Sequence, residues 1–144
     1  MIWPMRFIFP LIIAMLIAGC LGNRLADVRA TEPRIIGNFQ VPYDQLASCT
    51  QARLEEDSWN FRPPFVSQPR IELTHEKARR LIHVYAIESR STLFDVTFER
   101  LYSGATLVQY RRSYEGVETQ THTWAIVERC AQLSEMPASS PGRS

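Results

Sequence analysis

The chain has 144 residues, with 16 basic and 15 acidic side chains and a formal net charge of +1 at pH 7. This balance argues against nucleic acid, and against a strong electrostatic interaction with anionic lipid, as primary partners, so we expect no nucleic-acid partner. The length is enough for one domain with a substantial core.

The chain begins with an apolar segment. Residues 7–18 read FIFPLIIAMLIA, without a charge, and follow Arg6. As a helix this run would be about 18 Å long, too short for the ~30 Å hydrocarbon core of a bilayer. Its layout predicts a secretory signal peptide over residues 1–19, with Met1 and Met5 both possible starts.

The end of this segment carries a recognisable motif. Ile17, Ala18, Gly19 and Cys20 resemble the lipobox of bacterial lipoproteins, in which an aliphatic residue and two small residues precede a cysteine. The resemblance implies a diacylglyceryl thioether on Cys20, cleavage before it and acylation of its new amino group, an anchor that holds permanently. With Leu21 rather than aspartate next, it also implies the outer membrane and its periplasmic face. An ordinary signal peptide and an uncleaved anchor are the alternatives.

Two further cysteines, Cys49 and Cys130, remain in the 125 residues that cleavage after residue 19 would leave. In an oxidising compartment such an isolated pair is expected to join, which would close a loop of about 80 residues. The alternative is two buried free thiols. Their spacing excludes a CxxC redox pair or a zinc cluster.

The segment after the motif predicts a tether and then a helix. Residues 20–34 mix small, polar and charged types, which favours a lipidated flexible tether. A short apolar stretch, residues 35–41, follows. A helix is predicted from Tyr43 to about Asp57, with Asp44 as its cap. Its inward stripe is expected to hold Leu46, Cys49 and Ala52.

Residues 58–70 hold three prolines and three aromatic residues, which favours an ordered irregular connection. The aromatic side chains either form a possible binding patch or, more commonly for such residues, cover the core. They are Trp59, Phe61 and Phe65.

Four strands are predicted next, over residues 71–74, 81–87, 93–102 and 106–114. In the third, Phe94, Val96, Phe98 and Tyr102 are expected on one side, and Ser103-Gly104 supplies the turn to the fourth.

Residues 123–133 favour a helix over a strand, and residues 134–144 a disordered tail. The fold class is therefore α+β: one domain over residues 35–133, with a roughly four-stranded antiparallel sheet. An N-terminal and a C-terminal helix, linked by the disulfide, would cover one face and leave the other available to a partner.

The candidate chemistry is sparse. His75, His83 and His122 form no metal-binding or catalytic motif, and His83 is expected to be a buried, hydrogen-bonded imidazole. No cofactor and no metal are predicted. Two arginine pairs, Arg79-Arg80 and Arg111-Arg112, either form a basic patch on the sheet for acidic sugar or lipid phosphate, or are balanced by nearby acids.

These features predict a non-enzymatic envelope lipoprotein, attached to the membrane by lipid, that acts as an interaction or accessory subunit for an envelope protein partner. The alternatives are a protein that binds a small molecule or lipid between the sheet and residues 59–65, and a hydrolase.

Overall fold

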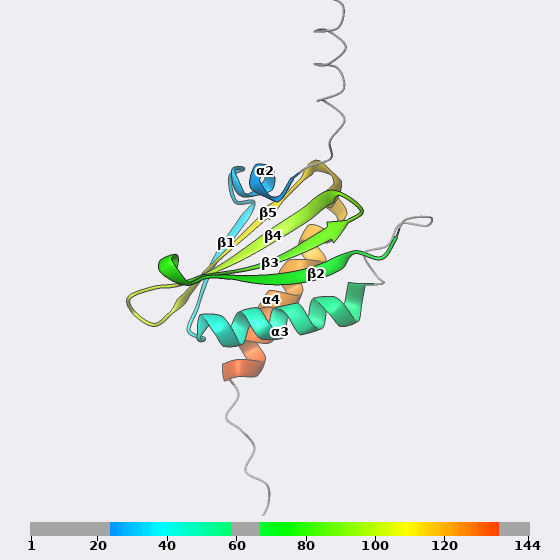
Figure 1. Ribbon diagram of the computed structural model, residues 1–144. Coiled ribbons are helices and arrows are strands. Elements are labelled where there is room, and N and C mark those ends of the chain that lie inside the picture. Colours follow the sequence, from blue (N-terminus) through cyan, green and yellow to red (C-terminus); the bar gives the residue numbers. More distant parts are fainter. Residues whose placement is uncertain (1–23, 59–66, 136–144) are drawn as a thin grey trace, which may run out of the picture.

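The computed structural model describes residues 24–58 and 67–135 (Figure 1). It has the predicted α+β class, with a five-stranded antiparallel sheet in the order β1-β5-β4-β3-β2. The elements are α2 (Leu25–Arg29), β1 (Ile35–Phe39), α3 (Tyr43–Asp57), β2 (Arg70–Glu76), the 3-10 helix η2 (Lys77–Arg79), β3 (Leu81–Glu88), β4 (Ser91–Arg100), β5 (Thr106–Arg112), the 3-10 helix η3 (Tyr114–Thr119) and α4 (Gln120–Glu135).

The sheet has one strand more than predicted. Strand β1 pairs with β5, with Ile35 opposite Tyr110 and Phe39 opposite Thr106. The sequence of residues 35–39 did not predict a strand, because Gly37 and Asn38 are poor strand formers. Gly37 is required by packing: a Cβ there would lie 2.8 Å from the Trp124 ring of α4.

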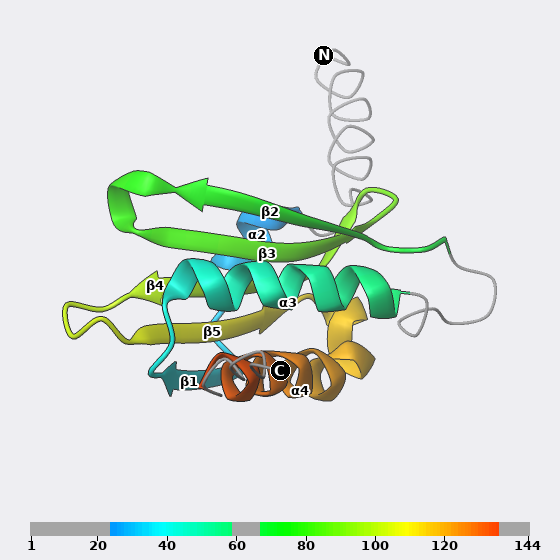
Figure 2. The ribbon, with the colours of Figure 1, turned by 90° about the horizontal axis from the view of Figure 1, so that it is seen from below.

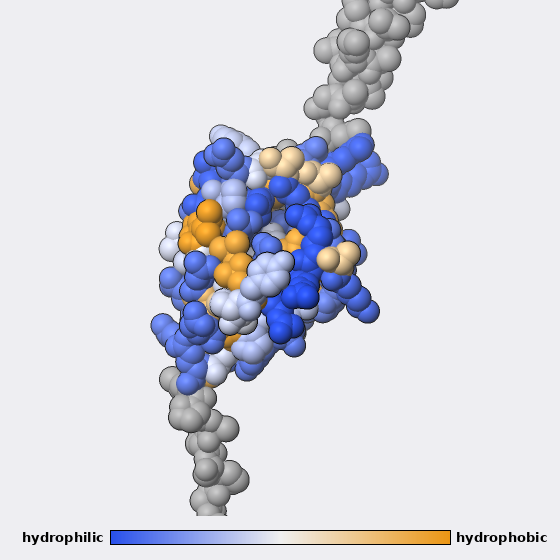
Figure 3. All heavy atoms as spheres, turned by 90° about the vertical axis from the view of Figure 1, so that its left-hand side faces the viewer, coloured by the Kyte–Doolittle hydropathy of each residue, from blue (hydrophilic) through white to orange (hydrophobic). Residues whose placement is uncertain are grey.

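Strands β2 to β5 form the predicted meander. The turn between β4 and β5 falls at Ser103-Gly104 as predicted, with Gly104 at φ +86° and the Leu101 N–H donating to the Ala105 carbonyl at 2.9 Å. Tyr102, predicted to face the core, is instead fully exposed, because β4 ends at Arg100. This end of the molecule is hydrophilic over most of its surface, with small separate apolar areas (Figure 3).

Helices α3 and α4 lie side by side on one face of the sheet, as predicted (Figure 2). The sulfur atoms of Cys49 and Cys130 are bonded, and this disulfide joins the two helices. The apolar side chains between helices and sheet are buried, among them Leu46, Leu54, Val84, Phe94, Val96, Phe98, Val108, Tyr110, Ile126 and Val127.

Helix α3 has the predicted bounds but differs in detail. Pro42 is its N-cap residue, and Asp44 lies in the first turn rather than acting as the cap. Ala52, predicted to face the core, is exposed. The buried stripe turns a little further around the helix and holds Leu46, Ala47, Thr50 and Leu54.

Helix α2 lies where a flexible tether was predicted, on the face opposite α3 and α4 (Figure 1). It packs on β4 and β5 through Val28, of which 2% is exposed. The Asp27 carboxylate accepts the Arg24 N–H at 3.3 Å and completes the first turn. The face expected to be free is therefore partly covered.

Several predicted features lie outside the described residues: Cys20 with its motif, the aromatic residues Trp59, Phe61 and Phe65, and residues 136–144 of the tail. Helix α4 continues through Glu135, two residues into the predicted tail. Within the described part of the chain, none of the helices has the length and apolar character to cross a bilayer.

Candidate functional site

The face of the sheet beneath α2 carries a buried carboxylate at its centre. Strand alternation directs Asp95 to this face, since its neighbours Phe94 and Val96 point into the core. Asp95 is fully buried, and its Oδ2 accepts the Thr97 hydroxyl at 3.3 Å. A buried carboxylate is stable only with charge or hydrogen-bond partners, and three elements supply them here.

The first partner is His83 on β3, which lies opposite Thr97 in the sheet. Its Nδ1 is 3.2 Å from Asp95 Oδ2, and its Nε2 is 3.4 Å from Glu76 Oε2. The tautomer of the ring decides which nitrogen carries the hydrogen in each of these contacts. The side chain is buried and hydrogen-bonded, which agrees with the sequence prediction for His83.

The second partner is Arg29 at the end of α2. Its Nε lies 3.5 Å from Asp95 Oδ1, and its guanidinium lies over the Tyr85 ring, 5.5 Å from the centroid. The Tyr85 hydroxyl donates to Glu72 at 3.1 Å. Burial, followed by this hydrogen bond, raises the pKa of Tyr85, which keeps the ring neutral beneath the cation.

The third partner is Arg111, opposite Asp95 on β5. Its guanidinium donates to the Thr31 carbonyl after α2 at 3.1 Å, to Thr97 at 3.3 Å and to Gln109 at 2.9 Å. Burial lowers the pKa of Arg111, and the Asp95 charge acts in the opposite direction. The side chain therefore connects the segment after α2 to the middle of the sheet.

A hollow of about 170 Å³ opens beside this network. It receives one arginine of each predicted pair, Arg79 and Arg111, together with Arg29. Glu76 and Glu99 line the same hollow, and Glu76 lies 3.5 Å from Arg79. Arg112 points to the other side of β5 and lines a different cavity. The predicted basic patch is therefore split, and the hollow is of mixed charge.

The arrangement constrains what this site can do chemically. Both nitrogens of His83 are held by carboxylates, so in this geometry neither is placed to take a proton from a nucleophile. Among the described residues no group of three His, Cys, Asp or Glu side chains could hold a metal ion. The network is suited to holding α2 on the sheet. It also leaves charged side chains of both signs around the hollow.

The sequence singled out two residues that the structure brings together, Cys49 and Cys130. It did not predict the grouping of Arg29, His83, Asp95 and Arg111. The available signal was the alternation of β4, which sets Asp95 and Thr97 opposite its apolar residues, but that signal does not say what the carboxylate meets.

Comparison of the chain with known protein families and with curated proteins found no match.

Proposed function

We propose that this chain is an envelope lipoprotein, anchored in the outer membrane through acylated Cys20, whose domain acts by binding other envelope components. The observation that carries the proposal is the disulfide between Cys49 and Cys130. Disulfides persist in oxidising compartments outside the cytoplasm. A signal peptide that ends in a lipobox-like motif is one route to such a compartment.

The disulfide joins helices α3 and α4, and we expect it to stabilise the folded domain. A domain at the membrane surface outside the cytoplasm must stay folded there, and a bond between α3 and α4 limits the entropy of the unfolded chain. Cys130 is fully buried and Cys49 is partly exposed, so the bond lies at the boundary of the core.

We propose binding rather than catalysis because the groups of the buried polar cluster around Asp95 contact one another. Asp95 contacts Thr97, His83 and Arg29, and His83 spans two carboxylates. The mixed charges around the hollow, Arg79 and Arg111 beside Glu76 and Glu99, complement a protein surface better than a polyanion. An envelope protein partner is therefore the first candidate ligand.

A cell fractionation experiment tests the anchor. Replacement of Cys20 by serine should move the protein from the membrane pellet to the soluble envelope fraction and remove the acyl mass from the N-terminal peptide. Ala18→Ser is the matched control, since it keeps a small residue before the cysteine. If Cys20→Ser stays in the pellet like the parent, acylation is not the anchor.

A substitution of Leu21, the residue after Cys20, tests the proposed sorting to the outer membrane. Leu21→Asp places an acidic residue after the cysteine, which in lipoproteins favours retention at the inner membrane. We expect the variant in the inner-membrane fraction and the parent in the outer one, with Leu21→Asn as the uncharged control. An unchanged distribution would contradict the proposed sorting.

The binding role is tested by cross-linking in intact membranes, followed by purification and mass spectrometry. One envelope protein enriched with the parent but not with an Arg79→Glu variant would support the mixed-charge hollow as its contact. Native mass spectrometry of the purified protein tests the alternative, because a co-purified small molecule or lipid would favour a ligand-binding protein.

A further inference from the structure

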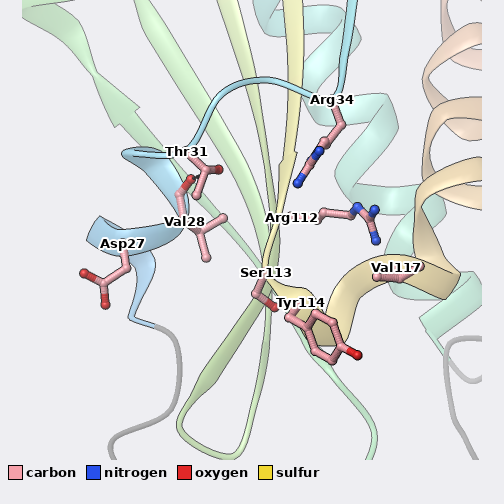
Figure 4. A pocket seen from close by; sticks show the side chains of 8 residues that line it. All are labelled: Asp27, Val28, Thr31, Arg34, Arg112, Ser113, Tyr114 and Val117. Atoms are coloured by element: carbon pink, nitrogen blue, oxygen red, sulfur yellow. Dashed lines mark hydrogen bonds between the residues drawn. The ribbon is translucent and has the colours of Figure 1, made fainter. Parts of the chain in front are cut away.

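A second cavity, of about 370 Å³, lies at the end of the sheet where α2, the start of β1, the end of β5 and η3 meet (Figure 4). Two arginines, Arg34 and Arg112, line it, and Tyr114 and Val117 of η3 stand at its rim. The other lining residues are Asp27, Val28, Thr31 and Ser113. We call the surface made by Arg34, Arg112, Tyr114 and Val117 the η3 surface.

The arginines of the η3 surface lack counter-ions among the described side chains. Two donors of Arg112, Nε and Nη1, are buried and have no hydrogen-bond partner among the side chains and backbone that the structure describes. Asp27, the acid that lines the cavity, points away from both guanidinium groups in Figure 4, and its carboxylate accepts the Arg24 N–H. A partly buried cation without an anion is costly, and phosphate, like carboxylate, is an anion that the arginine fork can bind with two parallel hydrogen bonds.

The rim is apolar and held in a fixed position. Tyr114 is 88% exposed and Val117 is 49% exposed. The segment that carries them is attached to β4, since the N–H and the hydroxyl of Ser113 both donate to the Leu93 carbonyl. Gly116 lies so close that a Cβ there would overlap this carbonyl oxygen. Tyrosine beside arginine is a combination typical of the headgroup region of membranes.

The chain itself brings the η3 surface close to the proposed anchor. Cys20 precedes Arg24 by four residues, which span at most about 14 Å. Arg24 is bonded to Asp27 at the cavity. The β4–β5 hairpin is at the other end of β4, whose ten residues extend over roughly 33 Å. A lipid on Cys20 would therefore place the η3 surface, and not the hairpin, at the bilayer.

We propose that the η3 surface docks on the membrane that holds Cys20. Arg34 and Arg112 bind the phosphate of an anionic phospholipid, and Tyr114 and Val117 enter the headgroup layer. This inference rests on the proposed function, because it takes the nearby membrane from the acylated cysteine. Docking would fix the orientation of the domain and turn the hairpin end away from the bilayer.

Amide exchange of the full-length acylated protein in vesicles tests the docking. Vesicles of phosphatidylcholine alone are compared with vesicles that also contain phosphatidylglycerol. We expect slower exchange in residues 112–119 on the anionic vesicles and no change in residues 101–105 of the hairpin. Each arginine near an anionic surface contributes about fivefold to binding, so Arg34→Gln combined with Arg112→Gln should abolish the difference.

Two matched variants control for charge and for aromatic character. Arg80→Gln with Arg100→Gln removes the same charge from exposed side chains toward the hairpin end and should keep the protection. Tyr114→Ser should weaken the protection, whereas Tyr102→Ser, at a tyrosine of the hairpin that is also exposed, should not. The tyrosine pair keeps the test decisive if loss of Arg112 disturbs folding.

Three results would overturn the docking: equal exchange of residues 112–119 on both kinds of vesicle, equal slowing at the hairpin, or the same slowing by glycerol 3-phosphate without vesicles. The last would mean a site for a soluble phosphate. The mass of the peptide that contains residue 20 reports separately on the anchor. An acylated peptide with unchanged exchange refutes docking alone, and an unacylated peptide with slowed exchange refutes the anchor alone.

Discussion

On one face of the sheet, α3 and α4 cover Phe94, Val96 and Phe98, and a disulfide joins the helices. On the other face, the five-residue helix α2 is held over Asp95 by Arg29 and by one small apolar contact from Val28. Burial of apolar area supplies most of the stability of a domain and depends little on direction. The polar network depends on the placement of each charge and adds less net free energy.

The difference indicates a division of roles. We expect the face under α3 and α4 to unfold only with the whole domain, because its side chains are buried against one another on the central strands. Helix α2 is short and could open locally at a lower cost, and the cavity of the η3 surface and the mixed-charge hollow both include its residues. Both surfaces that we propose for binding therefore include a segment whose local stability we expect to be low.

The disulfide should give the largest effect. It links residues 81 apart in the chain, and the chain-entropy model gives a loss of about 4.5 kcal/mol when it is removed. Thermal melts of the parent with and without reductant should differ by many degrees. The double variant Cys49→Ala with Cys130→Ala should have a melting temperature close to that of the reduced parent, and reductant should not change it. A parent that melts equally in both conditions would contradict this role.

Removal of a core aromatic should be almost as costly. Phe94 is fully buried, and its ring centroid lies 5.6 Å from that of Tyr110. Phe94→Ala should lower the free energy of unfolding by about 4 kcal/mol, since it leaves a cavity that the sheet cannot close. Tyr102→Ala, on the exposed hairpin, is the control and should change it by less than about 0.5 kcal/mol. Denaturant titration measures the free energy of unfolding of both variants. Similar losses in the two would mean that Phe94 does not lie in the core.

Alkaline pH should destabilise the face under α3 and α4 through the ionisation of its buried Tyr110. Burial raises the pKa of this core tyrosine from about 10 to about 12. Between these values the unfolded chain loses the proton first, so stability falls as the pH rises, by up to about 2.7 kcal/mol. Tyr110→Phe should lose less stability over this range, and Tyr102→Phe should behave as the parent. If the stability of the parent and of Tyr110→Phe changed equally with pH, the raised pKa of Tyr110 would be contradicted.

The sequence predicted the elements whose pattern is local. The alternation of Phe94, Val96 and Phe98 identified β4, and the bounds of α3 were predicted correctly. The disulfide was predicted from the number of cysteines and from the oxidising compartment that the signal-like segment predicts. These features need no knowledge of neighbours, because period and composition determine them.

The parts that were missed depend on distant residues. Strand β1 exists because β5 offers an unpaired edge, although Gly37 weakens its own propensity. Helix α2 buries a single side chain, and its other support, Arg29 on Asp95, joins residues 66 apart in sequence. The candidate site was missed for the same reason, since only the register of three strands brings His83, Asp95 and Arg111 together.

The smallest expected effect is also the one specific to the polar face. Asp95→Asn keeps the shape of the side chain but leaves Arg29 and His83 without their central charge, which should cost about 2 kcal/mol. We expect faster amide exchange at Val28 and Ala30 of the α2 segment, with α3 and α4 little affected by comparison, because the network holds α2 rather than the core. Glu99→Gln, on the same strand and face but partly exposed, is the control and should leave α2 unchanged. Equal acceleration across α2, α3 and α4 would mean that Asp95 supports the whole domain, and the two faces would then form one cooperative unit.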